Sequence, residues 1–143
     1  MAATENGHRT FDLSVVTPEG TAFEGEAQML VVPGADGEIG VLARHAPLVA
    51  MLKAGEIRVR VPGGETHSFA AGPGYFKVQR DRAIVLVDDA VRAQDIDIDQ
   101  ARLEVEEARA LLERAEAGDE GIDRWQAEQR LRHAENKVAV AGR

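Results

Sequence analysis

Residues 33–48 read PGADGEIGVLARHAPL, and the rest of the sequence is organised around this stretch. Its three glycines allow positive φ angles and close backbone approach, while its two prolines fix φ and remove a hydrogen-bond donor. This mixture predicts a turn, a short strand over residues 39–42 and a second bend before Pro47. Glu38 and His45 flank the expected strand. The stretch is therefore a candidate docking surface, although an ordinary solvated loop carries such residues as well.

Composition excludes several classes of function. A chain of 143 residues is long enough for one domain, or for one small domain with an appendage. A formal net charge of −8 argues against a nucleic-acid partner. The sequence has no cysteine, and hence no disulfide, thiolate nucleophile or cysteine metal site. No segment approaches the roughly 18 apolar residues of a membrane span, so we expect no direct span and a membrane connection only through a partner.

The first two thirds of the chain have the pattern of a β-sheet. Residues 11–15 and 56–61 alternate apolar and polar positions, which is the period of a half-buried strand. Turn signals such as TPEG at residues 17–20 recur about every 8–12 residues. Many short strands separated by such turns predict an antiparallel β-sandwich or barrel over residues 11–90, after a flexible tail at residues 1–10.

Toward the C-terminus the apolar period becomes that of a helix. Small and aliphatic residues recur at spacings of three and four in two segments, separated by a break at residues 118–121. Asp95 or Asp97 can cap the first helix, and Asp123 can begin the second. The pattern predicts an antiparallel helical hairpin over residues 95–141. The expected fold class is therefore α+β, with the sandwich first and the two-helix hairpin second.

The seam expected between the two helices is mostly alanine. A buried methyl-sized group contributes only about 0.8 kcal/mol, whereas ordering one residue costs about 1–2 kcal/mol. We therefore expect the hairpin to lean on the sandwich or on a partner through Leu103, Leu111 and Trp125. Two interpretations stay open, a hairpin that docks in more than one place and a permanently packed helical tail.

No catalytic set of residues stands out. The four histidines are scattered without a His-x-x-x-His pair, and no glycine-rich phosphate loop is present. Asp88 and Asp89 could be read as a carboxylate pair, but neighbours at a strand end normally point apart. We expect no catalytic residue, no metal site and no enzymatic activity of the chain itself.

The order of residues in the opening stretch resembles a known signature. Residues 36–42 (DGEIGVL) followed by residues 44–48 (RHAPL) are similar to the Glu-Gly-Glu-Leu-Gly-Ile and His-Ala-Pro-Leu pattern of the epsilon subunit of bacterial F-type ATP synthases. The flanking segments at residues 16–20, 88–90 and 96–97 fit this pattern too. The resemblance extends from Phe11 to near Val140.

This resemblance implies a non-catalytic rotor subunit of the central stalk. In that family the sandwich binds the gamma subunit and the membrane-embedded c-ring, and it helps to couple proton translocation to ATP synthesis. Carried over, Glu38 lies in the loop that faces the c-ring, and His45 lies beside the gamma and c-ring contact. The implied location is the cytoplasmic face of the cell membrane, as a peripheral part of the complex.

The resemblance also implies a regulatory hairpin. In many bacterial members the hairpin extends along gamma into the head formed by alpha and beta subunits and inhibits ATP hydrolysis. The basic residues of the second helix become candidates for inhibitory contacts with acidic surfaces there, with solvated helix faces as the alternative. These residues are Arg124, Arg130, Arg132 and Lys137.

Some relatives bind ATP in the folded hairpin through an Ile/Leu-Asp-x-x-Arg-Ala motif. This sequence keeps Asp99 and Arg102 of that motif, but Leu103 replaces the alanine. His133 and Lys137 occupy positions where those relatives carry arginines, and neither side chain has the planar fork of a guanidinium. We therefore expect no cofactor, and ATP as a regulatory ligand is disfavoured.

Three rival functions belong to other classes. A free-standing ATP-sensing protein would bind ATP in equilibrium dialysis. A small sandwich enzyme would need the catalytic set that the sequence lacks. A generic coiled-coil adaptor would bind its partner even after mutation of Glu38 and His45.

Overall fold

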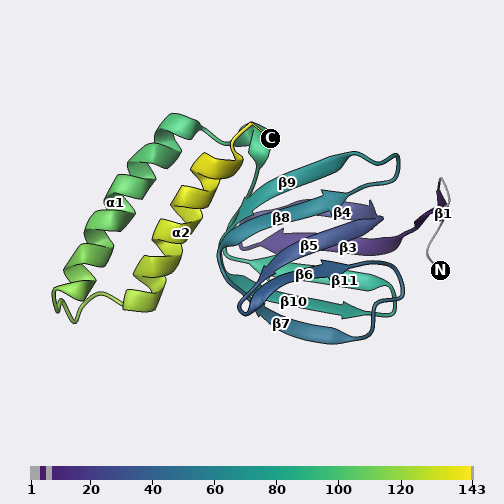
Figure 1. The fold of residues 1–143 in the computed structure, drawn as a ribbon, viewed down its shortest axis with the longest axis horizontal. Helices are drawn as coiled ribbons and strands as arrows, with labels where there is room; N and C mark the ends of the chain where they lie inside the picture. Colours follow the sequence, from purple (N-terminus) through teal and green to yellow (C-terminus); the bar gives the residue numbers. More distant parts are fainter. Residues whose placement is uncertain (1–3, 6–7, 143) are drawn as a thin grey trace.

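A computed structural model describes residues 4–5 and 8–142, which form a β-domain with a helical hairpin at one end (Figure 1). The predicted fold class is confirmed, because a sandwich of short strands is followed by two antiparallel helices. The ten main strands are β3 (Phe11–Thr17), β4 (Gly20–Ala27), β5 (Met29–Gly34), β6 (Gly37–Val41), β7 (Leu48–Leu52), β8 (Gly55–Arg60), β9 (Thr66–Ala71), β10 (Gly74–Gln79), β11 (Arg82–Val87) and β12 (Ala90–Arg92).

The sheet wraps around one core. Its strand order is β12-β9-β8-β5-β7-β10-β11-β3-β4, and β6 pairs with β5 beside this path. Among the described strands, β3 and β11 form the one parallel pair, which the antiparallel prediction did not include. These two strands are far apart in the sequence, so no tight turn requires them to run in opposite directions.

The core consists of the inward-facing residues of the strands. The alternation predicted for residues 11–15 is confirmed, because Phe11, Leu13 and Val15 are buried. The same core contains further large side chains, among them Phe69, Phe76 and Ile57. This continuous core makes the sandwich a stiff support for its loops.

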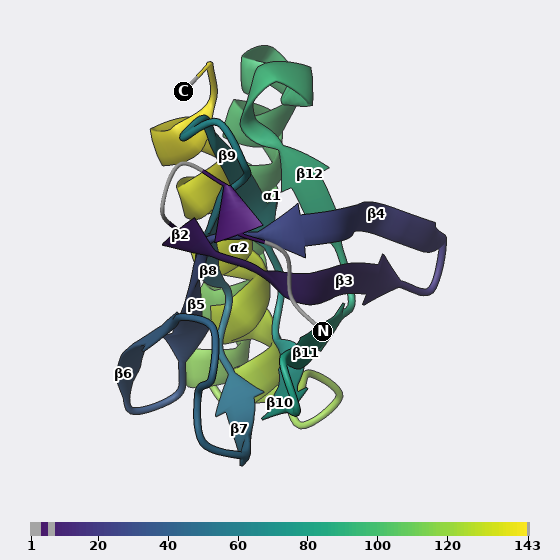
Figure 2. The ribbon, with the colours of Figure 1, turned by 90° about the vertical axis from the view of Figure 1, so that its right-hand side faces the viewer.

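The N-terminal segment lies apart from this core. Two short strands, β1 (Thr4–Glu5) and β2 (His8–Arg9), pair with each other, whereas residues 1–3 and 6–7 lie outside the described residues. Figure 2 shows β2 and β3 from the side opposite the hairpin, with the helices behind the strands. The limits chosen for the tail, the sandwich and the hairpin stay predictions.

The hairpin has the caps that the sequence indicates. Helix α1 (Ile98–Glu116) begins after Asp97, whose side chain accepts a hydrogen bond from the backbone N–H of Gln100. Helix α2 (Arg124–Val140) begins after Asp123 in the same way. Asp95 instead belongs to a short 3₁₀ turn, η1 (Ala93–Asp95), so Asp97 is the cap of α1. The four seam alanines that are buried are Ala101, Ala108, Ala127 and Ala134.

Helix α2 alone lies against the sandwich, and α1 forms the outer layer (Figure 1). The sequence predicts that Leu103, Leu111 and Trp125 pack on the sandwich or on a partner. Leu103 and Trp125 are 52% and 51% exposed and are not buried by the sandwich, Leu111 on the outer helix is half-buried, and packing on a partner stays a prediction. Leu103 is on the outer helix, and Trp125 is at the solvent-facing start of α2. Within the described part of the chain, neither helix is both long and apolar enough to cross a membrane.

Candidate functional site

The signature stretch forms a tight β-hairpin and a second bend. Gly34 pairs with Gly37 at the end of β5 and β6, and a Cβ atom on Gly34 would lie 2.5 Å from the carbonyl oxygen of Gly37. Gly37 itself has a φ of 139°, which favours glycine. The predicted turn is present, but the strand expected over residues 39–42 is β6 at Gly37–Val41, so Glu38 lies within the strand, which ends at the buried Val41.

Glu38 is exposed on this hairpin but already has a partner. The Arg58 guanidinium donates to both carboxylate oxygens of Glu38, at 3.2 and 3.4 Å, and to Glu56 at 3.3 Å. The hydrogen bonds to Glu38 raise the pKa of Arg58. Sequence reasoning did not find Arg58, because its pairing requires β6 and β8 to lie on either side of β5. Glu38 is therefore presented in a fixed position.

His45 lies in the bend that follows β6. Its backbone N–H donates to Leu42, and its Nδ1 donates to the carbonyl oxygen of Ala46 at 2.6 Å. The neighbouring Arg44, at a φ of 65°, donates its backbone N–H to the carboxylate of Asp81. This bond ties the bend to the turn between β10 and β11. Glu38 is the second residue of β6, whereas His45 lies beyond the other end of that strand. His45 does not line the hollow that Glu38 lines.

An exposed apolar row crosses three neighbouring strands. Tyr75 on β10 pairs in register with Met51 on β7 and with Leu86 on β11. Met51 and Tyr75 are each 55% exposed, and Val49 on β7 is 67% exposed. Large apolar side chains gathered on one face of a folded domain mark an interaction surface. We call Val49, Met51, Tyr75 and Leu86 the apolar row.

The signature hairpin and the apolar row share a hollow. A depression of about 520 Å³ is lined by Glu38 and Ile39 on one side and by Val49 and Met51 on the other. A second hollow, of about 510 Å³, lies beside the row and is lined by the cations Lys77, Arg80 and Arg82. The surface is thus apolar in its middle and charged at its margins, as protein interfaces are.

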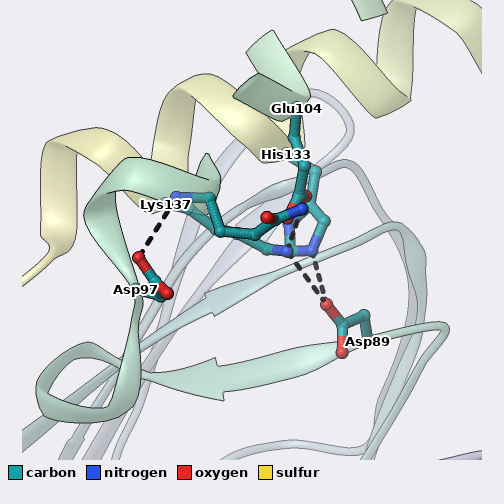
Figure 3. Close-up of polar contacts among 6 residues, drawn as sticks. Asp89, Asp97, Glu104, His133 and Lys137 are labelled. Atoms are coloured by element: carbon teal, nitrogen blue, oxygen red, sulfur yellow. Dashed lines mark hydrogen bonds and ion pairs between the residues drawn. The ribbon is translucent and has the colours of Figure 1, made fainter. Parts of the chain in front are cut away.

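A second polar cluster joins the hairpin to the sandwich (Figure 3). The Nε2 atom of His133 lies 2.8 Å from Oδ2 of Asp89, and Nζ of Lys137 lies 3.7 Å from the same oxygen. Lys137 also donates to Oε2 of Glu104 on α1 at 2.9 Å. The hydrogen bond from His133 lowers the pKa of Asp89, whereas burial raises the pKa of neighbouring Asp88.

The residues of the implied ATP motif do not join this cluster. Asp99 and Arg102 are exposed on α1. Lys137, at a position where some relatives carry an arginine, is paired with the protein's own carboxylates. Among the described residues, no group of three or more His, Asp or Glu has a metal-binding arrangement.

The candidate inhibitory residues differ in accessibility. Arg124 is exposed and forms ion pairs with Glu116 and Glu128, and Arg132 is exposed as well. Arg130 is an exposed residue that lines a hollow of about 320 Å³ together with Trp125. The side chain of Lys137, by contrast, is only 14% exposed. Three of the four candidates are thus open to a partner in this arrangement.

Comparisons with known proteins agree on one family. Residues 10–93 match the family model of the ATP synthase delta/epsilon chain beta-sandwich domain. The ATP synthase epsilon chain of Halalkalibacterium halodurans is 39% identical over 94% of this chain and 98% of its own length. That of Desulforamulus reducens is 41% identical over 93% of this chain and 98% of its own length.

Solved structures show the same fold at lower identity. A chain in the cryo-EM structure of the Euglena gracilis mitochondrial ATP synthase (OSCP, F1 and c-ring) superposes with a TM-score of 0.75. It is 24% identical and is matched over 97% of this chain and 87% of its own length. The sandwich, the signature hairpin and the relatives agree, and the protein therefore belongs to the ATP synthase epsilon-chain family, as a non-catalytic subunit of that complex.

Proposed function

We propose that this subunit is a stiff adaptor of the central stalk that joins gamma to the c-ring. The proposal rests on one observation, the continuous exposed surface from the signature hairpin to the apolar row. A rotor part must transmit torque without deforming, and the closed core beneath this surface suits that task. In this way the subunit helps to couple proton translocation to ATP synthesis.

We assign the gamma contact to the apolar row. Burial of Met51, Tyr75 and Leu86 under a partner would remove apolar area from water, which is the main driving force of association. The cations beside the row favour a partner that carries acidic residues next to its own apolar surface. These cations are Lys77, Arg80 and Arg82. His45 lies in the bend that leads into β7, one of the strands that carry the row.

We assign the c-ring contact to the signature hairpin. The turn before Glu38 is exposed, and Arg58 holds the Glu38 carboxylate in place. A pre-positioned charge loses little side-chain freedom when a basic loop of the c-ring approaches. The subunit would then work at the cytoplasmic face of the cell membrane, as a peripheral component.

We also propose that the hairpin is a brake on ATP hydrolysis. Helix α2 contacts the sandwich through polar groups, including the hydrogen bond between Ala54 and Gln129. Water can replace polar contacts of this kind, so the hairpin can leave the sandwich without exposing its core. Arg124, Arg130 and Arg132 would then meet acidic surfaces of the alpha and beta subunits. The docked hairpin needs no bound ATP in this proposal.

The test is ATP hydrolysis by a reconstituted alpha-beta-gamma head. The head alone is compared with the head plus the full chain and the head plus a chain ending at Ala93. We expect the full chain to slow hydrolysis and the truncated chain to bind gamma without slowing it. If both chains give equal hydrolysis rates while both still co-elute with gamma, the adaptor role stands and the proposed brake is contradicted.

A further inference from the structure

Three elements meet at the polar cluster between hairpin and sandwich. Asp89 belongs to the sandwich side, at the turn between β11 and β12; His133 and Lys137 belong to α2, and Glu104 belongs to α1. Figure 3 shows His133 and Lys137 both pointing toward Asp89, which is the acceptor on the sandwich side for both. One carboxylate thus holds two side chains of the same helix.

The basic side chains of the cluster are largely shielded from water, whereas its carboxylates are partly exposed. The side chains of His133 and Lys137 are 13% and 14% exposed, and those of Asp89 and Glu104 are 38% and 33% exposed. Ion pairs on a protein surface contribute little, but removal of one partner from a partly buried, hydrogen-bonded pair leaves the other charge without its counterion, which is destabilising. The packing around them is modest, because the buried residues of α2 are small or polar apart from Val140. The cluster therefore adds a charge-dependent contribution to the attraction between α2 and the sandwich, beside the hydrogen bond of Gln129.

We propose that the contacts of Asp89 with His133 and Lys137 form an electrostatic latch that keeps the hairpin docked on the sandwich. The latch also masks the charge of Lys137 until the hairpin is released. While the hairpin is docked, Asp89 and Glu104 neutralise Lys137. When α2 separates from both the sandwich and α1, Asp89 and Glu104 are left behind, and His133 and Lys137 become available to another acidic surface. The consequence for inhibition rests on the proposed brake, whereas the latch itself does not.

Removing the charge of Asp89 should therefore affect the inhibition of ATP hydrolysis differently from removing the charge of Lys137. Removing the charge of Asp89 weakens docking and leaves the released helix with all its basic groups. Removing the charge of Lys137 weakens docking and also removes one basic group that the released helix would use. The same loss of docking is therefore expected to have opposite consequences for inhibition.

Docking is measured first, on the full isolated chain. The absence of native cysteine allows spin labels on Leu103→Cys and Val49→Cys, two exposed positions on α1 and β7. The distance distribution between the labels separates docked from released molecules. We expect Asp89→Asn and Lys137→Gln each to lower the ratio of docked to released chain about tenfold.

The matched control is Glu107→Gln, which removes an exposed carboxylate of α1 outside the cluster. It should leave the distance distribution unchanged. Far-ultraviolet circular dichroism checks that the helices persist in every variant. If both latch variants keep the distribution of the Glu107→Gln control while they remain folded, the latch is overturned.

Inhibition is measured second, with Asp89→Asn, Lys137→Gln and Glu107→Gln in the unlabelled chain without cysteine and with the alpha-beta-gamma head. Asp89→Asn should inhibit hydrolysis more strongly than the unaltered chain, and Lys137→Gln should not. Equal inhibition by the two variants would overturn the masking of Lys137. If docking shifts while no variant changes hydrolysis, the brake fails and the latch stands, so the two proposals fail in distinguishable ways.

Discussion

The backbone N–H of Ala54 donates to the side-chain oxygen of Gln129 at 2.9 Å, across 75 residues of sequence. Ala54 precedes β8, and Gln129 lies on α2, where it is 7% exposed. A buried backbone donor needs a partner, and here the partner comes from the other structural unit. This bond fixes where α2 rests on the sandwich.

Substitution of Gln129 by alanine should loosen the docked hairpin. The Ala54 N–H would lose its acceptor in a buried position, at a cost of about 1–3 kcal/mol. Hydrogen exchange at the Ala54 amide should accelerate accordingly. Gln126→Ala, at an exposed position of α2, serves as the control. An unchanged exchange rate in Gln129→Ala would show that another acceptor suffices.

Tyr75→Asp should weaken gamma binding without unfolding the sandwich. The side chain is more than half exposed, so the fold tolerates a charge there, whereas an apolar interface does not. We expect affinity for gamma to fall at least about tenfold. Binding is measured by calorimetry with purified gamma. Thr21→Asp, an exposed position on β4, should bind normally, and equal losses in both variants would contradict the assignment of the row.

Gly34→Ala should destabilise the signature hairpin. The added Cβ would lie 2.5 Å from the carbonyl oxygen of Gly37 and 2.9 Å from the side chain of Ile39. Forcing atoms into a packed site costs about 1–3 kcal/mol. Gly40→Ala meets nothing within 4 Å and should change stability by less than about 0.5 kcal/mol. Urea denaturation of both variants gives the comparison, and equal midpoints would contradict it.

The pH dependence of stability should differ between Asp88 and Asp89. The hydrogen bond from His133 holds the pKa of Asp89 below its ordinary value of 3.8. Its stabilising contribution is therefore present above that value and is lost as the pH falls through the lowered pKa. Asp89→Asn should lower the free energy of unfolding at pH 7, and its difference from the unaltered chain should shrink in acid.

Burial acts on Asp88 with the opposite sign. Because burial raises the pKa of Asp88 above 3.8, this group favours the folded state only at low pH, and the contribution is lost as the pH rises through the raised pKa. Asp88→Asn should therefore raise the free energy of unfolding at pH 7. Urea titrations between pH 3 and pH 7 test both variants. The same sign of change for both at pH 7 would contradict this account.

Glu38→Gln should leave the fold intact and weaken the c-ring contact. The ion pair between Glu38 and Arg58 is exposed, so its loss should cost within about 1 kcal/mol of stability. Co-sedimentation with c-ring vesicles reports the contact. Glu24→Gln, an exposed position on β4, is the control for charge. If Glu38→Gln binds normally, the c-ring contact lies elsewhere on the sandwich.

The sequence by itself determined the features that depend on near neighbours. The alternation of Phe11, Leu13 and Val15 predicts a strand because successive side chains of a strand face opposite sides. The caps Asp97 and Asp123 act on backbone groups three residues away, so their role is visible in the sequence. The glycines of the signature stretch predict its turn for the same local reason.

The tertiary structure alone decided which distant residues meet. The parallel pairing of β3 with β11 and the bond between Arg58 and Glu38 depend on the order of strands in the sheet. The contacts of Asp89 with His133 and Lys137 depend on which face of α2 rests on the sandwich. A helical period identifies an apolar stripe, but it does not say which of two neighbours that stripe will cover.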